Sequence, residues 1–133
     1  MSKAYIPLKE LEIYQLSRQL SKIAWSIYER LEWQDKKIMG DQFIESVDSV
    51  GANIAEGYTR YHYLDKVKFY YYSRGSLAES CHHWLELLLE RGKISSELYS
   101  SIKAIHKPLE IKLNNTITVT KNSQQGLNNN DRS

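Results

Sequence analysis

Apolar residues recur every three or four positions along most of this chain, which is the spacing of one face of an α-helix. Four such series follow one another, and no strand-like alternation appears before residue 116. The pattern therefore predicts helices over about residues 7–31, 36–56, 65–90 and 94–115. The series are Ile13, Leu16, Leu20, Ile23, Ile27 and Leu31; Met39, Phe43, Val47, Val50 and Ile54; Val67, Tyr70, Arg74, Leu77, Cys81, Trp84 and Leu88; and Leu98, Ile102, Ile105, Leu109 and Leu113.

The connections between these helices are short, and short connections make consecutive helices antiparallel neighbours. The sequence thus predicts an all-α fold, an antiparallel up-down four-helix bundle, over residues 1–115. From Thr116 onward the chain is rich in threonine, asparagine and serine. Such a composition offers little apolar surface to bury, so residues 116–133 are predicted to form a flexible, mobile tail.

The second helix ends in a stretch of small residues, from Ser46 to Gly57. Small side chains let a neighbouring backbone approach closely, and Gly57 stands where a left-handed residue would end the helix. Glu56 lies at the unfavourable end of the helix dipole, and Arg60 is the nearest cation that could compensate it. Asn53 and Glu56 either complete this last turn or contact another helix or subunit.

Length and composition indicate one ordinary globular domain, with 133 residues of which 41% are hydrophobic and 26% charged. No apolar run is long enough to span a membrane, and the N-terminus lacks the apolar region of a secretory signal. The single cysteine, Cys81, forbids an intrachain disulfide and suggests a packing role in a reducing compartment. A cytoplasmic protein without membrane contact is expected.

Positive charge and tyrosine gather between residues 58 and 74, although the net charge of the chain is only +2. Aromatic faces stack on unpaired bases, and lysine and arginine neutralise phosphates, so this segment is a candidate RNA-binding site. Tyrosines pointing outward could instead fill a subunit interface. The candidate residues are Arg60, Lys66, Lys68 and Arg74, with Tyr58, Tyr61 and Tyr71.

Only one motif suggests metal chemistry, the Glu-x-x-His of Glu79 and His82. Dinuclear sites in helical bundles need a second such motif and two further inward carboxylates, and the fourth helix has Glu97-Leu-Tyr-Ser100 and Glu110-Ile-Lys-Leu113 in place of that motif. His82 and His83 are therefore expected at the surface. Phosphate-binding glycine loops and nucleophile elbows are also missing from the sequence. We expect no catalysis, no cofactor and no metal site.

Aromatic residues exceed what one four-helix core needs, notably Tyr14, Trp25, Tyr28 and the run from Tyr70 to Tyr72. Exposed aromatic patches commonly mark contacts between proteins. The sequence therefore predicts a homo-oligomer.

Three stretches resemble a known family: Leu11-Glu-Ile-Tyr-Gln, Val50-Gly-Ala-Asn-Ile-Ala-Glu-Gly57 and Ser73-Arg-Gly-Ser-Leu-Ala-Glu79. They are similar to the four-helix-bundle proteins encoded in intervening sequences of bacterial 23S ribosomal RNA genes. The signature positions matched here are Gln42, Ser49, Asn53, Glu56, Gly57, Gly75, Ser76 and Glu79.

The resemblance implies a cytoplasmic ring, a pentamer, that binds RNA and carries out no catalysis. A similar fold in the accessory proteins of diversity-generating retroelements, which bind nucleic acid and a reverse transcriptase, implies a protein-protein adaptor as the alternative. One residue departs from the family pattern: Glu45 stands where relatives often carry a basic residue.

Overall fold

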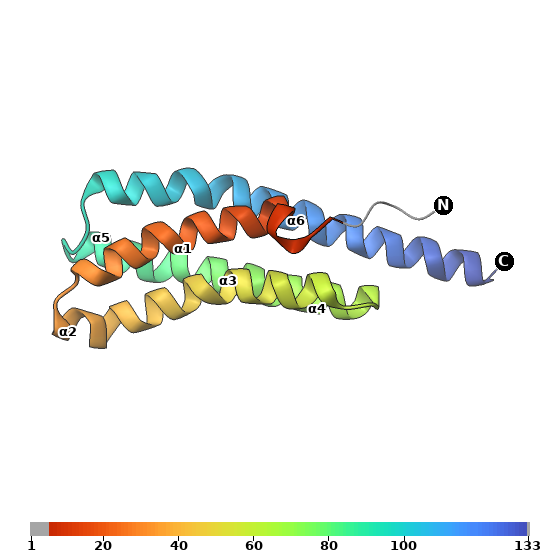
Figure 1. The fold of residues 1–133 in the computed structure, drawn as a ribbon, viewed down its shortest axis with the longest axis horizontal. Coiled ribbons are helices and arrows are strands. Elements are labelled where there is room, and N and C mark those ends of the chain that lie inside the picture. The colour runs from red at the N-terminus through yellow and green to blue at the C-terminus, as the bar shows by residue number, and fades with distance from the viewer. Residues whose placement is uncertain (1–5, 133) are drawn as a thin grey trace.

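Four long helical segments make up the part of the chain described by the computed structural model, which covers the backbone of residues 6–132 and the side chains of residues 6–123 (Figure 1). A 3-10 turn, η1 (Leu8–Glu10), precedes them. The segments are α1 (Glu12–Arg30); α2 (Trp33–Asp35), η2 (Lys36–Gly40) and α3 (Asp41–Thr59); α4 (Tyr63–Ala78), η3 (Glu79–Trp84) and α5 (Leu85–Glu90); and α6 (Ser96–Arg132). Both η2 and η3 are π-helical turns inside otherwise continuous helices.

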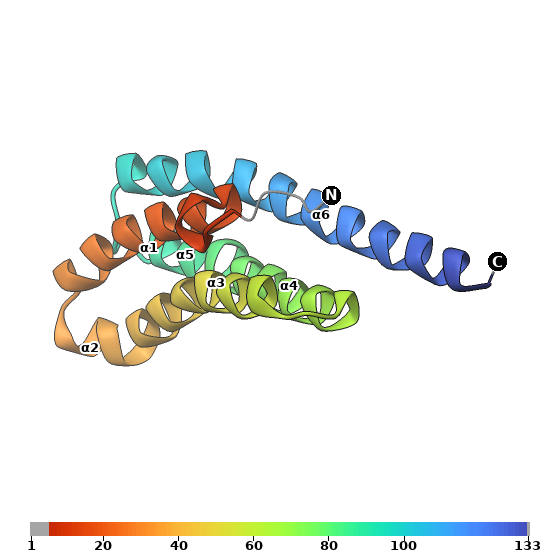
Figure 2. The same ribbon diagram turned by 45° about the vertical axis from the view of Figure 1, so that its right-hand side comes forward.

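Each segment packs against two others: α1 and α4 each lie against both α3 and α6. Consecutive segments run in opposite directions, and α6 extends past the ends of the other helices (Figures 1 and 2). The predicted antiparallel four-helix bundle is confirmed. Within the described residues, no helix is both long enough and apolar enough to cross a membrane.

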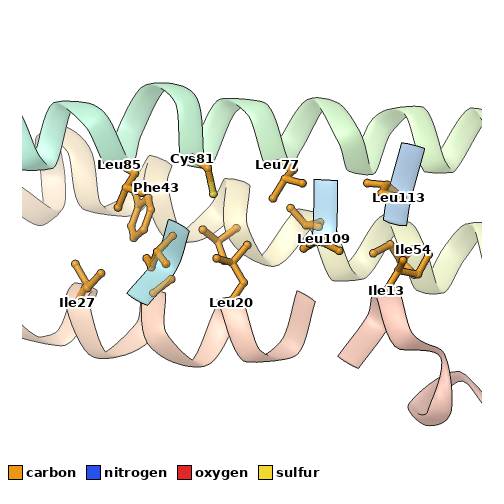
Figure 3. Packing of buried hydrophobic residues seen from close by; sticks show 14 of the residues in the cluster. Ile13, Leu20, Ile27, Phe43, Ile54, Leu77, Cys81, Leu85, Leu109 and Leu113 are labelled. Carbon is orange, nitrogen blue, oxygen red and sulfur yellow. The ribbon is translucent and has the colours of Figure 1, made fainter. Parts of the chain in front are cut away.

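The core is one continuous cluster of mainly aliphatic side chains along the bundle axis, and the ring of Phe43 lies in it beside Leu85 (Figure 3). Cys81 points into this core and is fully buried. Burial raises the pKa of its thiol to about 11. The cysteine therefore packs as a small apolar residue, as the sequence predicts.

The third predicted series departs from the structure at Arg74, the one member whose charge does not suit a core, and at Trp84. Arg74 is exposed and the neighbouring Ser73 is buried in its place, where its hydroxyl donates to the Val50 carbonyl at 2.8 Å. Beyond the π-turn η3, Leu85 is buried and Trp84 is only half-buried. Spacings of three and four both fit a helix, and the chain uses the spacing of four after Cys81, so Leu85 is buried in place of Trp84, while Leu88 is buried as predicted.

Packing reaches beyond residue 115. α6 continues through Thr116, and Ile117, one turn after Leu113, is only 3% exposed. The threonine hydroxyls do not disturb the helix, because Thr116 and Thr120 donate to the carbonyls of residues four earlier, at 2.9 and 2.7 Å. Residues 1–5 of the predicted domain, and the side chains of 124–133 in the predicted tail, lie outside the described part.

The continuation of α6 gives a matched pair of variants. Ile117→Ala should lower the free energy of unfolding by about 2–4 kcal/mol, because a buried isoleucine leaves a cavity. Val119→Ala, at a position that is 63% exposed, should change it by less than about 0.5 kcal/mol. Urea unfolding followed by circular dichroism measures both. Equal effects would mean that residue 117 does not pack in solution.

Candidate functional site

Gly57 is required by close packing and not by a left-handed turn, so that part of the prediction is wrong. α3 continues through Gly57 to Thr59, and Gly92, with φ 69°, has the positive φ among the described glycines. A Cβ atom on Gly57 would lie 2.9 Å from a ring carbon of Tyr70. The glycine therefore makes room for the buried Tyr70 ring of α4.

Gly51 has the corresponding role on the side of α3 that faces α1. A Cβ atom there would lie 2.8 Å from the hydroxyl oxygen of Ser17. The close approach predicted for this stretch is thus made within one chain. Beside it, a surface cavity of about 360 Å³ lies between α1 and α3, lined by Tyr14, Arg18, Asp48, Ala52 and Ala55 among others.

Four of the signature residues, Gln42, Ser49, Ser76 and Glu79, line one small cleft between α3 and the third segment. Glu45 and Ser46 complete the lining, and the cleft has a volume of about 120 Å³. Two carboxylates and no cation face it. Its chemistry therefore suits a cationic or hydrogen-bonding partner, and does not suit a phosphate.

The other four signature residues lie outside this cleft. The Asn53 amide donates to the Ser49 carbonyl at 2.9 Å, within its own helix. Glu56 pairs with Arg60 at 3.3 Å, as the sequence predicts. Gly57 packs beneath Tyr70, whereas Gly75 is exposed, and a Cβ atom added there would meet nothing within 4 Å.

Lys66 has a structural task that the sequence did not reveal. Its ammonium group donates to the carbonyls of Tyr58 and Gly57, at 2.8 and 3.4 Å, and lies 5.5 Å from the centre of the Tyr58 ring. A lysine on the last carbonyls of a helix stabilises that end. Partial burial lowers the pKa of Lys66. Lys66 therefore stabilises the C-terminal end of α3.

Three other predicted residues surround the turn between α3 and α4. The Tyr58 hydroxyl donates to the Ile6 carbonyl. The Arg60 guanidinium lies 4.7 Å from the centre of the Phe69 ring, in addition to its pairing with Glu56. Tyr61, 89% exposed, meets the His62 ring edge to face. The turn between α3 and α4 thus exposes the ring of Tyr61 to solvent, next to Arg60, whose guanidinium is already paired with Glu56.

A second basic group lies between α4 and α6. The Arg74 guanidinium donates to the side-chain oxygen of Asn114 at 3.1 Å. Arg74 and Lys121 lie 4.7 and 5.1 Å from the centre of the Tyr71 ring. Lys68 precedes Tyr71 by three residues, on the same side of the helix. We call Lys68, Tyr71, Arg74 and Lys121 the α4–α6 basic surface.

Lys121 is the member that sequence reasoning missed, because the prediction placed it in a mobile tail. The signal was present: Ile117 continues the spacing of Leu109 and Leu113. The three cations of the α4–α6 basic surface are exposed, and Tyr71 is half-buried.

Glu79 and His82 do not act together. The Glu79 carboxylate accepts a hydrogen bond from the Trp84 indole at 2.8 Å, whereas His82 turns to Glu110 of α6, at 3.1 Å. His82 and His83 are exposed, as the sequence predicts. Their helix therefore offers no Glu-x-x-His pair for a dinuclear centre.

Aromatic residues are distributed between core and surface. Tyr70 is buried, and burial raises its pKa to about 12. Trp25 and Tyr72 are each 50% exposed, and Trp25 stacks on Tyr28 with ring centres 5.3 Å apart. The surplus of aromatic surface predicted from the sequence thus lies mainly on α1 and α4.

Two kinds of comparison with known proteins give matches. A family model described as "23S rRNA-intervening sequence protein" matches residues 9–115. Among solved structures, a protein of unknown function from the S23 ribosomal protein family of Bacteroides thetaiotaomicron VPI-5482 superposes with a TM-score of 0.74 and 25% sequence identity. The match covers 80% of this chain and 96% of that one. No curated protein matches the chain.

Two signature glycines should respond oppositely to alanine. Gly57→Ala should lower the free energy of unfolding by about 1–2 kcal/mol, because the added methyl group meets the Tyr70 ring. Gly75→Ala should raise it by about 0.5–1 kcal/mol, since alanine favours a helix more than glycine and the position is open. Chemical denaturation of both variants measures the two shifts. A stabilising Gly57→Ala would contradict the packing role given to this glycine.

Proposed function

Because the chain belongs to the 23S rRNA-intervening sequence protein family, we propose that it is a non-enzymatic, cytoplasmic helical bundle that binds RNA as a homo-oligomer. The observation that carries the proposal is the α4–α6 basic surface, where two cations flank the ring of Tyr71. The family description connects the protein with a ribosomal RNA gene, and this surface supplies chemistry for RNA itself.

The α4–α6 basic surface suits the sugar-phosphate backbone of an unpaired or looped strand. Lys68, Arg74 and Lys121 are exposed, so phosphates can reach them without displacing a carboxylate partner. Tyr72, 50% exposed and next to Tyr71, offers a ring on which a base can stack. Such contacts depend little on base sequence, and their strength falls as salt concentration rises.

A specific observation also supports the adaptor function as a second candidate. At the turn between α3 and α4, Tyr61 and Leu64 are 89% and 66% exposed. Adjacent exposed apolar side chains commonly mark a protein contact. An adaptor would bind its partner at this tip, leaving the α4–α6 basic surface unused.

Removal of the three cations tests the RNA proposal. The triple variant Lys68→Ala, Arg74→Ala, Lys121→Ala should weaken binding of a labelled single-stranded RNA at least tenfold. The logarithmic salt slope should fall by about 2, since each phosphate contact contributes about 0.7 on single strands. Fluorescence anisotropy at two salt concentrations gives both quantities.

The matched control removes the same charge elsewhere. Lys22, Lys37 and Lys107 are exposed and lie in α1, η2 and the first half of α6. Their alanine variant should bind RNA within about threefold of wild type. If both triple variants bind alike, or if wild type shows no salt dependence, the α4–α6 basic surface is not an RNA site, and the adaptor becomes the leading proposal.

Self-association is tested separately. We expect light scattering after gel filtration to give a multiple of the 15.6 kDa chain mass, with the pentamer as the stoichiometry implied by the family resemblance. Trp25→Glu should shift the mass toward the monomer, because it replaces a half-exposed aromatic ring of the predicted contact surface with a charge. Trp33→Glu, at a position in α2 that is 71% exposed, should not. A wild-type monomer at tens of micromolar would end this proposal.

A further inference from the structure

Two histidines and one glutamate converge where the π-turn η3 meets α6. His82 Nε2 and His106 Nε2 lie 3.1 and 3.3 Å from the same carboxylate oxygen of Glu110. One ligand-type atom from each of the three residues lies within 4.8 Å of the others. The two imidazole rings meet edge to face, with centres 4.7 Å apart. A single point can therefore be reached by all three side chains.

His106 is the unusual member of this cluster. Its side chain is 3% exposed, and neither of its ring nitrogens has a hydrogen-bond partner among the described residues. The approach of Nε2 to Glu110 is close, but it lacks hydrogen-bond geometry. Buried polar atoms without partners are costly, so each one in a folded protein calls for an explanation. His106 Nε2 faces a carboxylate oxygen and a second imidazole from a buried position, which is the arrangement of a metal ligand.

We propose that His82, His106 and Glu110 bind one divalent transition-metal ion, with zinc as the best fit. At metal–ligand distances of about 2.0 to 2.1 Å, two ligands of a tetrahedral zinc ion lie about 3.3 Å apart. The two distances to Glu110 are therefore close to those of a formed site. Two imidazoles select zinc, cobalt, nickel or copper over magnesium and calcium, which prefer oxygen ligands throughout.

The backbone places these ligands in a suitable way. His106 and Glu110 are four residues apart and share one face of α6, and His82 approaches from the π-turn η3. π-turns occur frequently at functional sites, where the altered register redirects a side chain. His82 and Glu110 are 54% and 38% exposed, so water can occupy the remaining coordination position.

The charges around the cluster do not oppose an added cation strongly. Lys103 is the cation that influences His106, but its ammonium group is held by the Glu86 carboxylate at 3.2 Å and the Cys81 carbonyl at 3.1 Å.

The test uses full-length protein purified without a histidine tag and stripped of metal. Titration with Co²⁺, followed by visible absorption, and with Zn²⁺, followed by calorimetry, should each show one ion per chain. Zinc at 100 times its Kd should raise the Tm by about 10 °C, and Mg²⁺ should leave it unchanged. These readouts involve no RNA, so they do not depend on the proposed function.

His82 and Glu110 are partly exposed, so variants at these two positions should remain folded and can be tested for metal binding. His82→Ala and Glu110→Gln should each weaken Zn²⁺ binding at least tenfold, whereas His83→Ala, an exposed neighbour that packs on Trp84, should bind as wild type does. Circular dichroism verifies that all three remain helical. Absence of stoichiometric zinc or cobalt, or equal binding by His82→Ala and His83→Ala, would overturn the proposal.

Discussion

The register in which α6 lies against the third helical segment decides which of their side chains meet. Contacts between the two recur along their shared length, with rising residue numbers on α6 matched by falling numbers on the other segment. They are Lys103 with Glu86, Glu110 with His82, Asn114 with Arg74, and Lys121 with Tyr71. The buried Leu109, Leu113 and Ile117 hold this register from the core side. Sliding α6 by one turn, about 5.4 Å, would separate every pair.

Helical periodicity predicted the fold because each segment has one apolar face, and that information is local. It failed at two places in the third series for a physical reason. Spacings of three and four both fit a helix of 3.6 residues per turn, so the pattern could not choose between Ser73 and Arg74. For the same reason it could not choose between Trp84 and Leu85, three and four residues after Cys81, and Leu85 is the buried one. Neither choice is visible without the backbone.

The candidate sites were less predictable, because periodicity shows which residues share a helix face but not which faces meet. The sequence correctly placed His82 at the surface and paired Glu56 with Arg60. It could not show that His82 meets residues 24 and 28 positions later, at His106 and Glu110. Lys66 illustrates the same limit, since a cation predicted for phosphate serves the end of α3.

The proposed metal site and the α4–α6 basic surface both include residues of α6, but different buried residues fix their positions. Glu110 and Lys121 are eleven residues apart, about 16 Å along the helix, beyond direct contact. The three proposed ligands, Glu110 among them, lie next in sequence to fully buried core residues such as Leu109 and Cys81. Lys121 instead depends on the last buried turn, at Ile117, to stay over Tyr71. If the helix ended at Thr116, the metal ligands would still converge, but the α4–α6 basic surface would lose one of its three cations.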